Sequence, residues 1–344
     1  MTNPFTLSFG KQPLTYISRL EQTNEVVENF SSEPANCMMY MITGVRGAGK
    51  TVLMTSIAKE LTEDKKWVVV ELNPELDLLE QLAAKLYNLP ETHVLYAKAK
   101  IDLSFFGIGL SVEGGQQFTS IDTAIETMLS LLKKEGKKVL VLLDEVTNNK
   151  SMRILAHSFQ IYIRKELDIF ILMTGLYENI YQLQNEKSLT FLYRAPKIHM
   201  LPLNTGAIID SYKSIFNIDQ KSAKEMADET KGYAFAYQVL GYVKWRNPEK
   251  SLNQILPEYE QYLEEYVYQK IWSELSDTDR NVLFAFEGKE EMKIKHLRDK
   301  INMSSSLFST YRDRLDKKGL IDTSKYGFIG LLLPRFSNFV EKQR

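Results

Sequence analysis

The sequence contains too little cysteine and histidine for two common kinds of site. Its 344 residues include one cysteine, Cys37, and four histidines that are scattered along the chain. One thiol cannot form a disulfide within the chain or a thiolate zinc site, and no two histidines have the spacing of a helical zinc motif. We therefore expect neither a disulfide framework nor a metal site built from cysteine and histidine.

Long apolar runs are also missing. No stretch approaches the roughly 18 apolar residues of a transmembrane helix, and the first residues lack the basic and then apolar layout of a signal peptide. We therefore expect a cytoplasmic protein that makes no membrane contact. The net charge is −1, with 25% charged and 44% hydrophobic residues. Because these values are typical of globular domains, the overall charge does not select a polyanionic partner.

Short apolar runs alternate with amphipathic stretches, which predicts an α/β fold with a parallel sheet. The predicted strands are residues 38–42, 67–71, 139–143, 169–173 and 198–201, and the first two are followed by predicted helices at 50–61 and 76–86. Between residues 101 and 115, two alternating runs flank Gly107 and Gly109. We interpret them as an inserted β-hairpin, which either covers the sheet edge or contacts a partner or nucleic acid.

The strand pattern ends near residue 203. Residues 204–272 are predicted to be helical, and residues 273–344 have a third pattern, described below. We therefore predict three domains, at 1–203, 204–272 and 273–344.

Residues 44–51 match G-x-x-x-x-G-K-[ST] at every fixed position. Glycines let backbone N–H groups approach phosphate oxygens closely, and the helix that begins there favours an anion. Lys50 would place its charge on the β- and γ-phosphates, and the Thr51 hydroxyl would ligate Mg²⁺. The pattern predicts a site for ATP and Mg²⁺. The expected nucleotide contacts in this loop are Gly44, Val45, Arg46, Gly47, Ala48, Gly49, Lys50, Thr51 and Val52.

Asp144 and Glu145 follow the apolar run 139–143. A buried strand that ends in two carboxylates places them at the carboxyl edge of the sheet, where open α/β folds bind ligands. We expect Asp144 to hold Mg²⁺ and Glu145 to polarise the attacking water.

With these two motifs, the sequence resembles the AAA+/STAND branch of P-loop ATPases, especially the archaeal-ATPase group and the origin-recognition-like initiator ATPases. The resemblance covers most of the chain and implies an ATPase sheet domain, a small helical lid and a C-terminal winged helix. Residues 16–21 are similar to the family's entry segment, which implies adenine contacts near Ile17 and Arg19. Thr174 stands at the family's sensor position, where it either senses the γ-phosphate or simply ends a strand.

Arg194 lies in a segment, 188–195, that resembles the family segment with a conspicuous arginine before the last strand. The resemblance implies an arginine finger or γ-phosphate sensor, in cis or from a neighbouring subunit of a homo-oligomer; a structural salt bridge is the alternative. Where many AAA+ proteins have Gly-x-Arg in the lid, this chain has Gly232, Tyr233, Ala234 and Phe235. The missing arginine favours the STAND-like side of the family.

The C-terminal pattern predicts three helices and a two-stranded wing. Ser276 to Asp279 begin the first helix, Ser304 caps the third, and Gly319 ends it. The inward residues of the third helix are expected to be Leu307, Phe308, Tyr311 and Leu315. This arrangement resembles a winged helix-turn-helix domain.

Basic residues gather in this region, which carries 14 Lys and Arg against 11 Asp and Glu. We predict that residues 293–330 bind double-stranded DNA through phosphate contacts. Against this, Asp313 is expected on the exposed face of the third helix with Ser306, Ser309 and Lys317. The basic candidates are Lys293, Lys295, Arg298, Lys300, Arg312, Arg314, Lys317 and Lys318.

The leading interpretation is a slow, nucleotide-switched ATPase whose winged helix binds DNA. The alternative is a STAND-type signalling ATPase, in which the winged helix is an autoinhibitory or protein-binding module and DNA is not bound. Catalytic roles are expected for Lys50, Glu145, Thr174 and Arg194.

Overall fold

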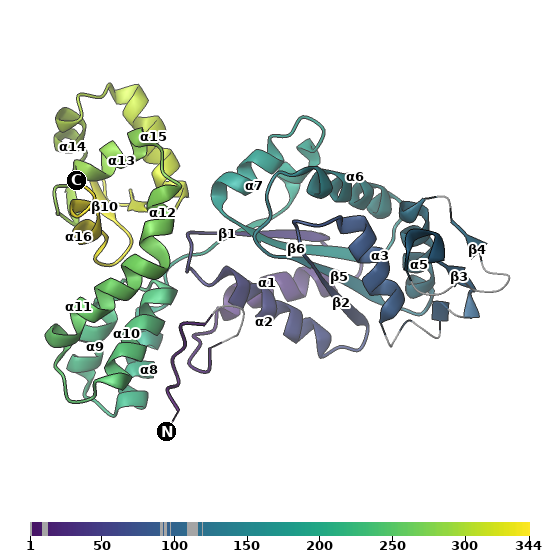
Figure 1. Ribbon diagram of the computed structural model, residues 1–344, viewed down its shortest axis with the longest axis horizontal. Coiled ribbons are helices and arrows are strands. Elements are labelled where there is room, and N and C mark those ends of the chain that lie inside the picture. Colours follow the sequence, from purple (N-terminus) through teal and green to yellow (C-terminus); the bar gives the residue numbers. More distant parts are fainter. Residues whose placement is uncertain are drawn as a thin grey trace. The chain divides into compact units, whose positions relative to one another are not determined.

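A computed structural model describes residues 2–8, 13–89, 92, 95–96, 98–108, 116–118 and 120–344 (Figure 1). The chain divides into two compact units. The sheet unit comprises Leu20–Thr43 and Leu53–His199, and the helical unit comprises Met1–Arg19, Gly44–Val52 and Met200–Arg344. None of the helices in the described part of the chain combines the length and apolar character that crossing a bilayer requires.

The sheet unit is built on a five-stranded parallel sheet with the order β2-β5-β6-β1-β7. Its strands are β1 (Met39–Thr43), β2 (Trp67–Leu72), β5 (Lys138–Leu143), β6 (Ile169–Gly175) and β7 (Lys197–His199). Every residue of β1 and β6 is buried, as expected for strands covered on both faces. The predicted α/β fold and its five strands are confirmed.

Helices cover both faces of this sheet (Figure 1). Side chains alternate between the faces along β1 and β6: Met41 and Ile171 join the core beneath α3, α5 and α6, whereas Tyr40 and Phe170 pack against Phe30 of α1. The helices of this unit are α1 (Leu20–Ser31), α2 (Lys50–Thr62, whose first turn belongs to the helical unit), α3 (Leu78–Asn88), α5 (Ile121–Lys134), α6 (Lys150–Arg164), α7 (Tyr177–Gln184) and a 3₁₀ turn at Thr190–Arg194.

The predicted hairpin at 101–115 is wrong for the residues that are described. β3 (Ile101–Asp102) pairs in parallel with β4 (Gln116–Gln117), and Ser104–Phe106 form a 3₁₀ turn that ends at Gly107 with a φ of 72°. Among the described residues, the first predicted strand is therefore confined to Ile101–Asp102, and its pairing is parallel rather than antiparallel. Residues 109–115 lie outside the described part of the chain.

After residue 203, the helical unit continues with four helices and a connecting helix that leads into the C-terminal segment. We call residues 204–273 the lid. Its elements are α8 (Thr205–Phe216), α9 (Gln220–Asp228), α10 (Ala234–Arg246), α11 (Leu252–Leu263), a π-helical turn at Glu264–Tyr268 and α12 (Gln269–Ser273). The π turn and α12 follow α11 without a break and lead into the C-terminal segment (Figure 1).

The C-terminal segment, residues 274–344, combines helices with a small sheet of order β8-β10-β9. Its elements are α13 (Asp277–Phe284), β8 (Glu291–Lys293), α14 (Ile294–Lys300), α15 (Ser305–Lys317), β9 (Ile321–Asp322), β10 (Phe328–Leu331) and α16 (Phe336–Glu341). The three predicted helices and the predicted strand pair are present. Leu307 is 47% exposed, so its predicted inward position is wrong; Phe308 and Leu315 are buried as expected.

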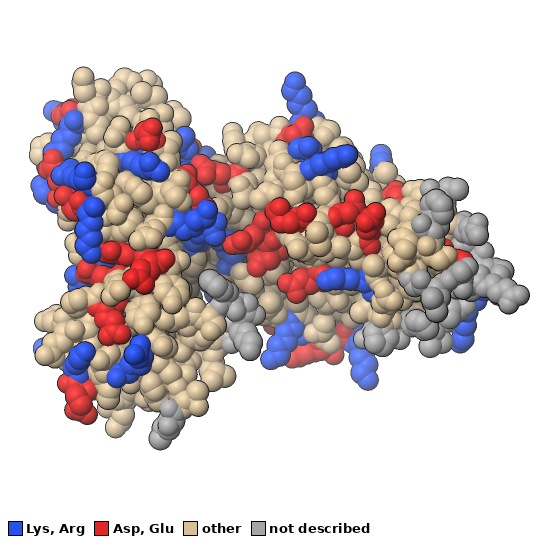
Figure 2. All heavy atoms as spheres, in the orientation of Figure 1, with Lys and Arg blue, Asp and Glu red and all other residues tan. Residues whose placement is uncertain are grey.

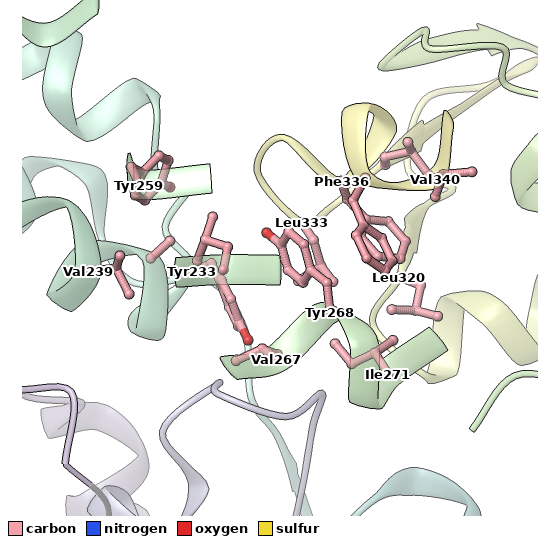
Figure 3. Packing of buried hydrophobic residues seen from close by; sticks show 14 of the residues in the cluster. Tyr233, Val239, Tyr259, Val267, Tyr268, Ile271, Leu320, Leu333, Phe336 and Val340 are labelled. Atoms are coloured by element: carbon pink, nitrogen blue, oxygen red, sulfur yellow. The ribbon is translucent and has the colours of Figure 1, made fainter. Parts of the chain in front are cut away.

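The lid and the C-terminal segment share one hydrophobic core. Figure 3 shows residues of the lid, including Tyr233 and Tyr259, in the same cluster as Leu333 and Phe336 of the C-terminal segment. Tyr268 joins the two parts, because its ring lies 5.1 Å from that of Phe336 and its hydroxyl donates to the Pro334 carbonyl at 2.5 Å. A shared, closely packed core links the lid to the C-terminal segment.

Candidate active site

The loop predicted to bind phosphate leaves the sheet directly after Thr43, the last residue of β1. Its turn is closed by the amide of Ala48, which donates to the Val45 carbonyl at 3.2 Å. Gly47 and Gly49 have φ angles of 73° and 91°, which other residues adopt only with strain. α2 then begins at Lys50, as predicted.

The five consecutive carbonyl groups from Gly44 to Ala48 all accept hydrogen bonds from the protein. Lys50 Nζ donates to the Gly44 and Val45 carbonyls at 3.0 and 3.1 Å. The Tyr233 hydroxyl donates to the Arg46 carbonyl, and the Phe235 amide donates to the Gly47 carbonyl at 3.1 Å. Arg19 Nη2 donates to the Ala48 carbonyl at 3.4 Å. The acceptors of the loop are thus held by its own lysine, the lid and the N-terminal segment.

Two amides of the same loop differ from its carbonyls. Within the described residues, the N–H groups of Gly47 and Gly49 donate to no other atom. Alternating left- and right-handed residues make successive N–H groups converge into a concavity that binds anions, and the start of α2 adds a partial positive charge. The loop therefore fits a phosphate group.

Thr174 and Asp144 are in direct contact at the ends of β6 and β5. The Thr174 hydroxyl donates to Asp144 Oδ1, and the Glu145 amide donates to Thr174 Oγ1 and Asp144 Oδ1, both at 3.1 Å. Thr174 is completely buried, Asp144 is half-buried and Glu145 is exposed. Glu145 has a φ of 53°, a left-handed conformation that non-glycine residues adopt rarely and often at functional sites.

The sheet register brings these strand ends to one edge. Thr43 pairs with Gly175, and Leu143 pairs with Met173, so β1, β6 and β5 end side by side. At the same edge, Thr43 Oγ1 lies 2.7 Å from His199 Nδ1. Burial, and secondarily the charge of Lys197, lower the pKa of His199 below 6.5. The predicted loop and the predicted carboxylates therefore both follow strands that end at this edge.

Two family models match parts of this chain. Residues 16–183 match the family model of an ATPase domain that occurs predominantly in Archaea. Residues 265–340 match a domain of unknown function, DUF8462, and a search of curated proteins found no match.

Several solved structures have a fold similar to that of this chain. A Walker-type ATPase of Pyrococcus abyssi aligns with a TM-score of 0.64 at 15% identity, over 95% of this chain and 96% of that chain. The ORC2 protein of Aeropyrum pernix, in its ADPNP–ADP complexes, aligns with a TM-score of 0.61 at 14% identity, over 97% and 96%. These likenesses extend the P-loop ATPase fold to nearly the whole chain, as the sequence predicted.

The structure places the two predicted adenine contacts in the helical unit. The Arg19 side chain contacts the phosphate loop through its hydrogen bond to the Ala48 carbonyl. Burial lowers the pKa of its guanidinium. Ile17 is half-buried and packs against the core of the helical unit.

Arg194 lies in the 3₁₀ turn that precedes β7 and is exposed. Within the described part of the chain, its guanidinium forms no ion pair or hydrogen bond, so the structural salt bridge considered as its alternative role is absent there. β7 runs parallel to β1, so Arg194 precedes the amino end of its strand, whereas Asp144 and Thr174 lie beyond or at the carboxyl ends of theirs. The structure therefore does not bring Arg194 to the edge at which these two residues lie.

Half of the predicted DNA-contacting cations already have partners. Arg314 and Lys318 both bind Asp279, whose side chain is 1% exposed. Lys317 pairs with Asp313, and Lys300 pairs with Glu287. Figure 2 shows basic and acidic side chains mixed over this segment. Of the eight predicted cations, Lys293, Lys295, Arg298 and Arg312 have no ion pair with any described residue.

Sequence reasoning missed the lid residues that hold the loop. Gly232 to Phe235 attracted notice only because an arginine was absent, yet Tyr233 and Phe235 bind two loop carbonyls. Gly232 fixes this segment: its φ is 72°, its carbonyl accepts from the Leu203 amide at 2.7 Å, and an added Cβ would lie 2.8 Å from the Leu203 carbonyl oxygen. The signal available in the sequence was a glycine directly before an aromatic residue, Gly232 before Tyr233.

The connection from the loop to the C-terminal segment was also not predicted. Arg46 Nη2 and Nε lie 2.9 and 3.4 Å from the two carboxylate oxygens of Glu274, the residue after α12. A Cβ placed on Gly319 would lie 3.5 Å from the Val45 Cβ. The variable positions of the loop therefore contact the lid and the C-terminal segment.

Proposed function

We propose that this chain binds ATP with Mg²⁺ and hydrolyses it slowly, and that the nucleotide state is transmitted through the lid to a C-terminal winged helix that binds duplex DNA. One observation supports nucleotide binding above all others. The carbonyl groups of the loop accept hydrogen bonds from the protein, whereas the Gly47 and Gly49 amides have no partner within the described residues and can donate to phosphate. The similar ORC2 structure was solved with ADPNP and ADP, which supports the same ligand class here.

Each residue at the strand ends has a role in this proposal. Lys50 transfers its hydrogen bonds from loop carbonyls to the β- and γ-phosphates, which are stronger acceptors because they are charged. Thr51 and Asp144 supply oxygen ligands of the kind that Mg²⁺ prefers, and bound Mg²⁺ neutralises charge on the phosphate oxygens. Thr174 orients the Asp144 carboxylate through their hydrogen bond, and Glu145 polarises the attacking water.

The DNA part rests on the cations that have no ion pair in the described residues. Lys293, Lys295, Arg298 and Arg312 can contact phosphates without breaking a pair, and Tyr326, between β9 and β10, is 100% exposed. Lys318 is unsuitable for a test of DNA binding, because its substitution would remove one of the two counter-charges of the buried Asp279 carboxylate and destabilise the fold. We therefore propose Lys295→Ala with Arg298→Ala to reduce salt-dependent duplex binding.

A STAND-type signalling switch is the second candidate. It is favoured by the contacts that tie the loop to the C-terminal segment, the Arg46–Glu274 pair and the approach of Gly319 to Val45. In this function, nucleotide exchange releases the C-terminal segment for assembly with other copies or for a protein partner.

ATP hydrolysis with and without duplex DNA separates the two functions. Stimulation by DNA that is lost in the Lys295→Ala, Arg298→Ala variant supports the first. Hydrolysis that is indifferent to DNA, together with an ATP-dependent change in oligomeric state, supports the second. A wild-type chain that binds no ATP in the presence of Mg²⁺ contradicts both.

A further inference from the structure

Tyr233 occupies an unusual position for a lid residue. It is the residue before α10, it is 6% exposed, and its hydroxyl donates to the carbonyl of Arg46 inside the phosphate loop. Figure 3 shows it with Val267 of the π turn among the residues of the shared core. Burial raises the pKa of this hydroxyl far above 10, so it remains a hydrogen-bond donor throughout the physiological pH range.

The loop has space for this side chain only because residue 47 is glycine. A Cβ built on Gly47 would lie 2.2 Å from the Tyr233 hydroxyl oxygen and 2.9 Å from the Phe235 Cβ. The Phe235 amide then binds the next carbonyl, that of Gly47, at 3.1 Å. The start of α10 is therefore fitted to the loop backbone at two successive peptide groups.

The orientation of a peptide group couples its two ends. When the carbonyl of Arg46 is held by Tyr233, the N–H of Gly47 in the same planar peptide must point the opposite way. The Phe235 bond fixes the next peptide, between Gly47 and Ala48, in the same manner. The N–H of that second peptide, on Ala48, closes the loop's turn by donating to the Val45 carbonyl. The Tyr233 bond thus sets the direction of the Gly47 N–H, which has no partner within the described residues and can bind the anion.

We infer that Tyr233 is a positioning residue of the phosphate loop: its hydroxyl holds the peptide between Arg46 and Gly47 in the orientation that receives phosphate. This inference rests on the proposed nucleotide site and extends it, because the residue belongs to the lid rather than to the loop. Arg46 is held twice, at its carbonyl by Tyr233 and at its guanidinium by Glu274. A change in the loop's conformation therefore reaches both the lid and the end of α12.

The test is Tyr233→Phe in the full-length chain, which removes one oxygen atom and keeps the ring. Tyr259→Phe is the matched control, because Tyr259 is also buried in the lid and its hydroxyl donates to a backbone carbonyl, that of Glu229, at 2.9 Å. Both variants lose one buried hydrogen bond and should be destabilised to a similar extent. Urea unfolding measures that loss for each of them.

Binding of a fluorescent ATP analogue with Mg²⁺ separates the two variants. We expect Tyr233→Phe to bind about five- to tenfold more weakly than wild type, the effect of one lost hydrogen bond on the loop's competent conformation, and Tyr259→Phe to bind like wild type. Equal affinity of Tyr233→Phe and wild type would overturn the inference, as would an equal loss in the control.

Hydrogen exchange in the nucleotide-free chain tests the same inference without the proposed function. Tyr233→Phe should accelerate exchange of the Ala48 and Phe235 amides, both of which are hydrogen-bonded at the loop, and Tyr259→Phe should leave them unchanged. If wild type binds no nucleotide but this exchange pattern appears, the positioning role stands and the ATPase proposal fails. If both amides keep their wild-type protection in Tyr233→Phe, the positioning role is refuted.

Discussion

Substituting Gly47 by alanine tests how tightly the lid is fitted to the phosphate loop. The new Cβ would meet the Tyr233 hydroxyl oxygen at 2.2 Å and would stand at a φ of 73°. The left-handed backbone alone costs about 1–2 kcal/mol, partly offset by about 0.4–1 kcal/mol from a less flexible unfolded chain. Displacing Tyr233 adds about 1–3 kcal/mol for the unpaired Arg46 carbonyl and about 1–3 kcal/mol for overpacking. We expect a total loss of about 3–5 kcal/mol in the free energy of unfolding.

Gly327→Ala is the matched control for backbone strain. Its φ is 78°, but no atom lies within 4 Å of an added Cβ, so we expect a loss of only about 1 kcal/mol. Both variants are compared by urea unfolding without nucleotide, in a Trp67→Phe background. The remaining tryptophans, Trp245 and Trp272, then report on the helical unit alone.

A double-mutant cycle isolates the clash. The Tyr233→Phe variant already lacks the hydroxyl oxygen, which is the atom nearest to the new Cβ, and its hydrogen bond to the loop. In that background, Gly47→Ala should therefore lower the free energy of unfolding by about 1 kcal/mol less than it does in wild type. Our reasoning would be refuted if Gly47→Ala destabilised the helical unit no more than Gly327→Ala, or if the cycle showed no coupling.

Three further predictions concern other charged residues. Arg194→Ala should abolish hydrolysis and spare ATP affinity, and wild-type turnover per chain should rise with protein concentration if the arginine acts on a neighbouring copy; unchanged turnover would exclude a catalytic role. Asp279→Asn should lower the free energy of unfolding by about 2–4 kcal/mol, because Arg314 and Lys318 lose a buried counter-charge. Asp313→Asn removes an exposed pair and should lower it by less than about 1 kcal/mol. Similar losses in the two variants would contradict this reasoning. The lowered pKa of His199 means that its contribution to stability is complete above pH 6.5 and is lost as the pH falls from there through the lower pKa of the folded state. An NMR titration should show this pKa rising in Lys197→Gln, and an unchanged pKa would contradict the effect of the Lys197 charge.

The sheet was predictable because its signals are local. Buried parallel strands are continuous apolar runs, and the residues of the phosphate loop follow a fixed pattern, so β1, β5 and β6 were located from the sequence to within about two residues. The pairing of the segment near residue 101 was not predictable, because an alternating apolar pattern predicts an extended chain but does not identify the strand with which that chain pairs. The parallel pairing of Ile101 with Gln116 spans many intervening residues.

The contacts around the loop were beyond sequence reasoning for a different reason. Tyr233 and Glu274 are distant from Arg46 in the chain, and apart from the glycine before Tyr233 nothing in their neighbourhoods distinguishes them from ordinary residues of helical segments. The basic cluster of the C-terminal segment was correctly located but overcounted, because the burial of Asp279 beneath Arg314 and Lys318 depends on helix packing. Charge composition counts cations, but only the fold shows which of them already have partners.

Release of phosphate from ATP in the presence of Mg²⁺ tests the central claim most directly, with wild type, Lys50→Ala and Glu145→Gln compared at equal concentration. The account predicts slow release by wild type, loss of nucleotide binding in Lys50→Ala, and retained ATP binding without release in Glu145→Gln. Wild-type rates of release in both variants would contradict the assignment of this sheet edge as an ATP-hydrolysing site.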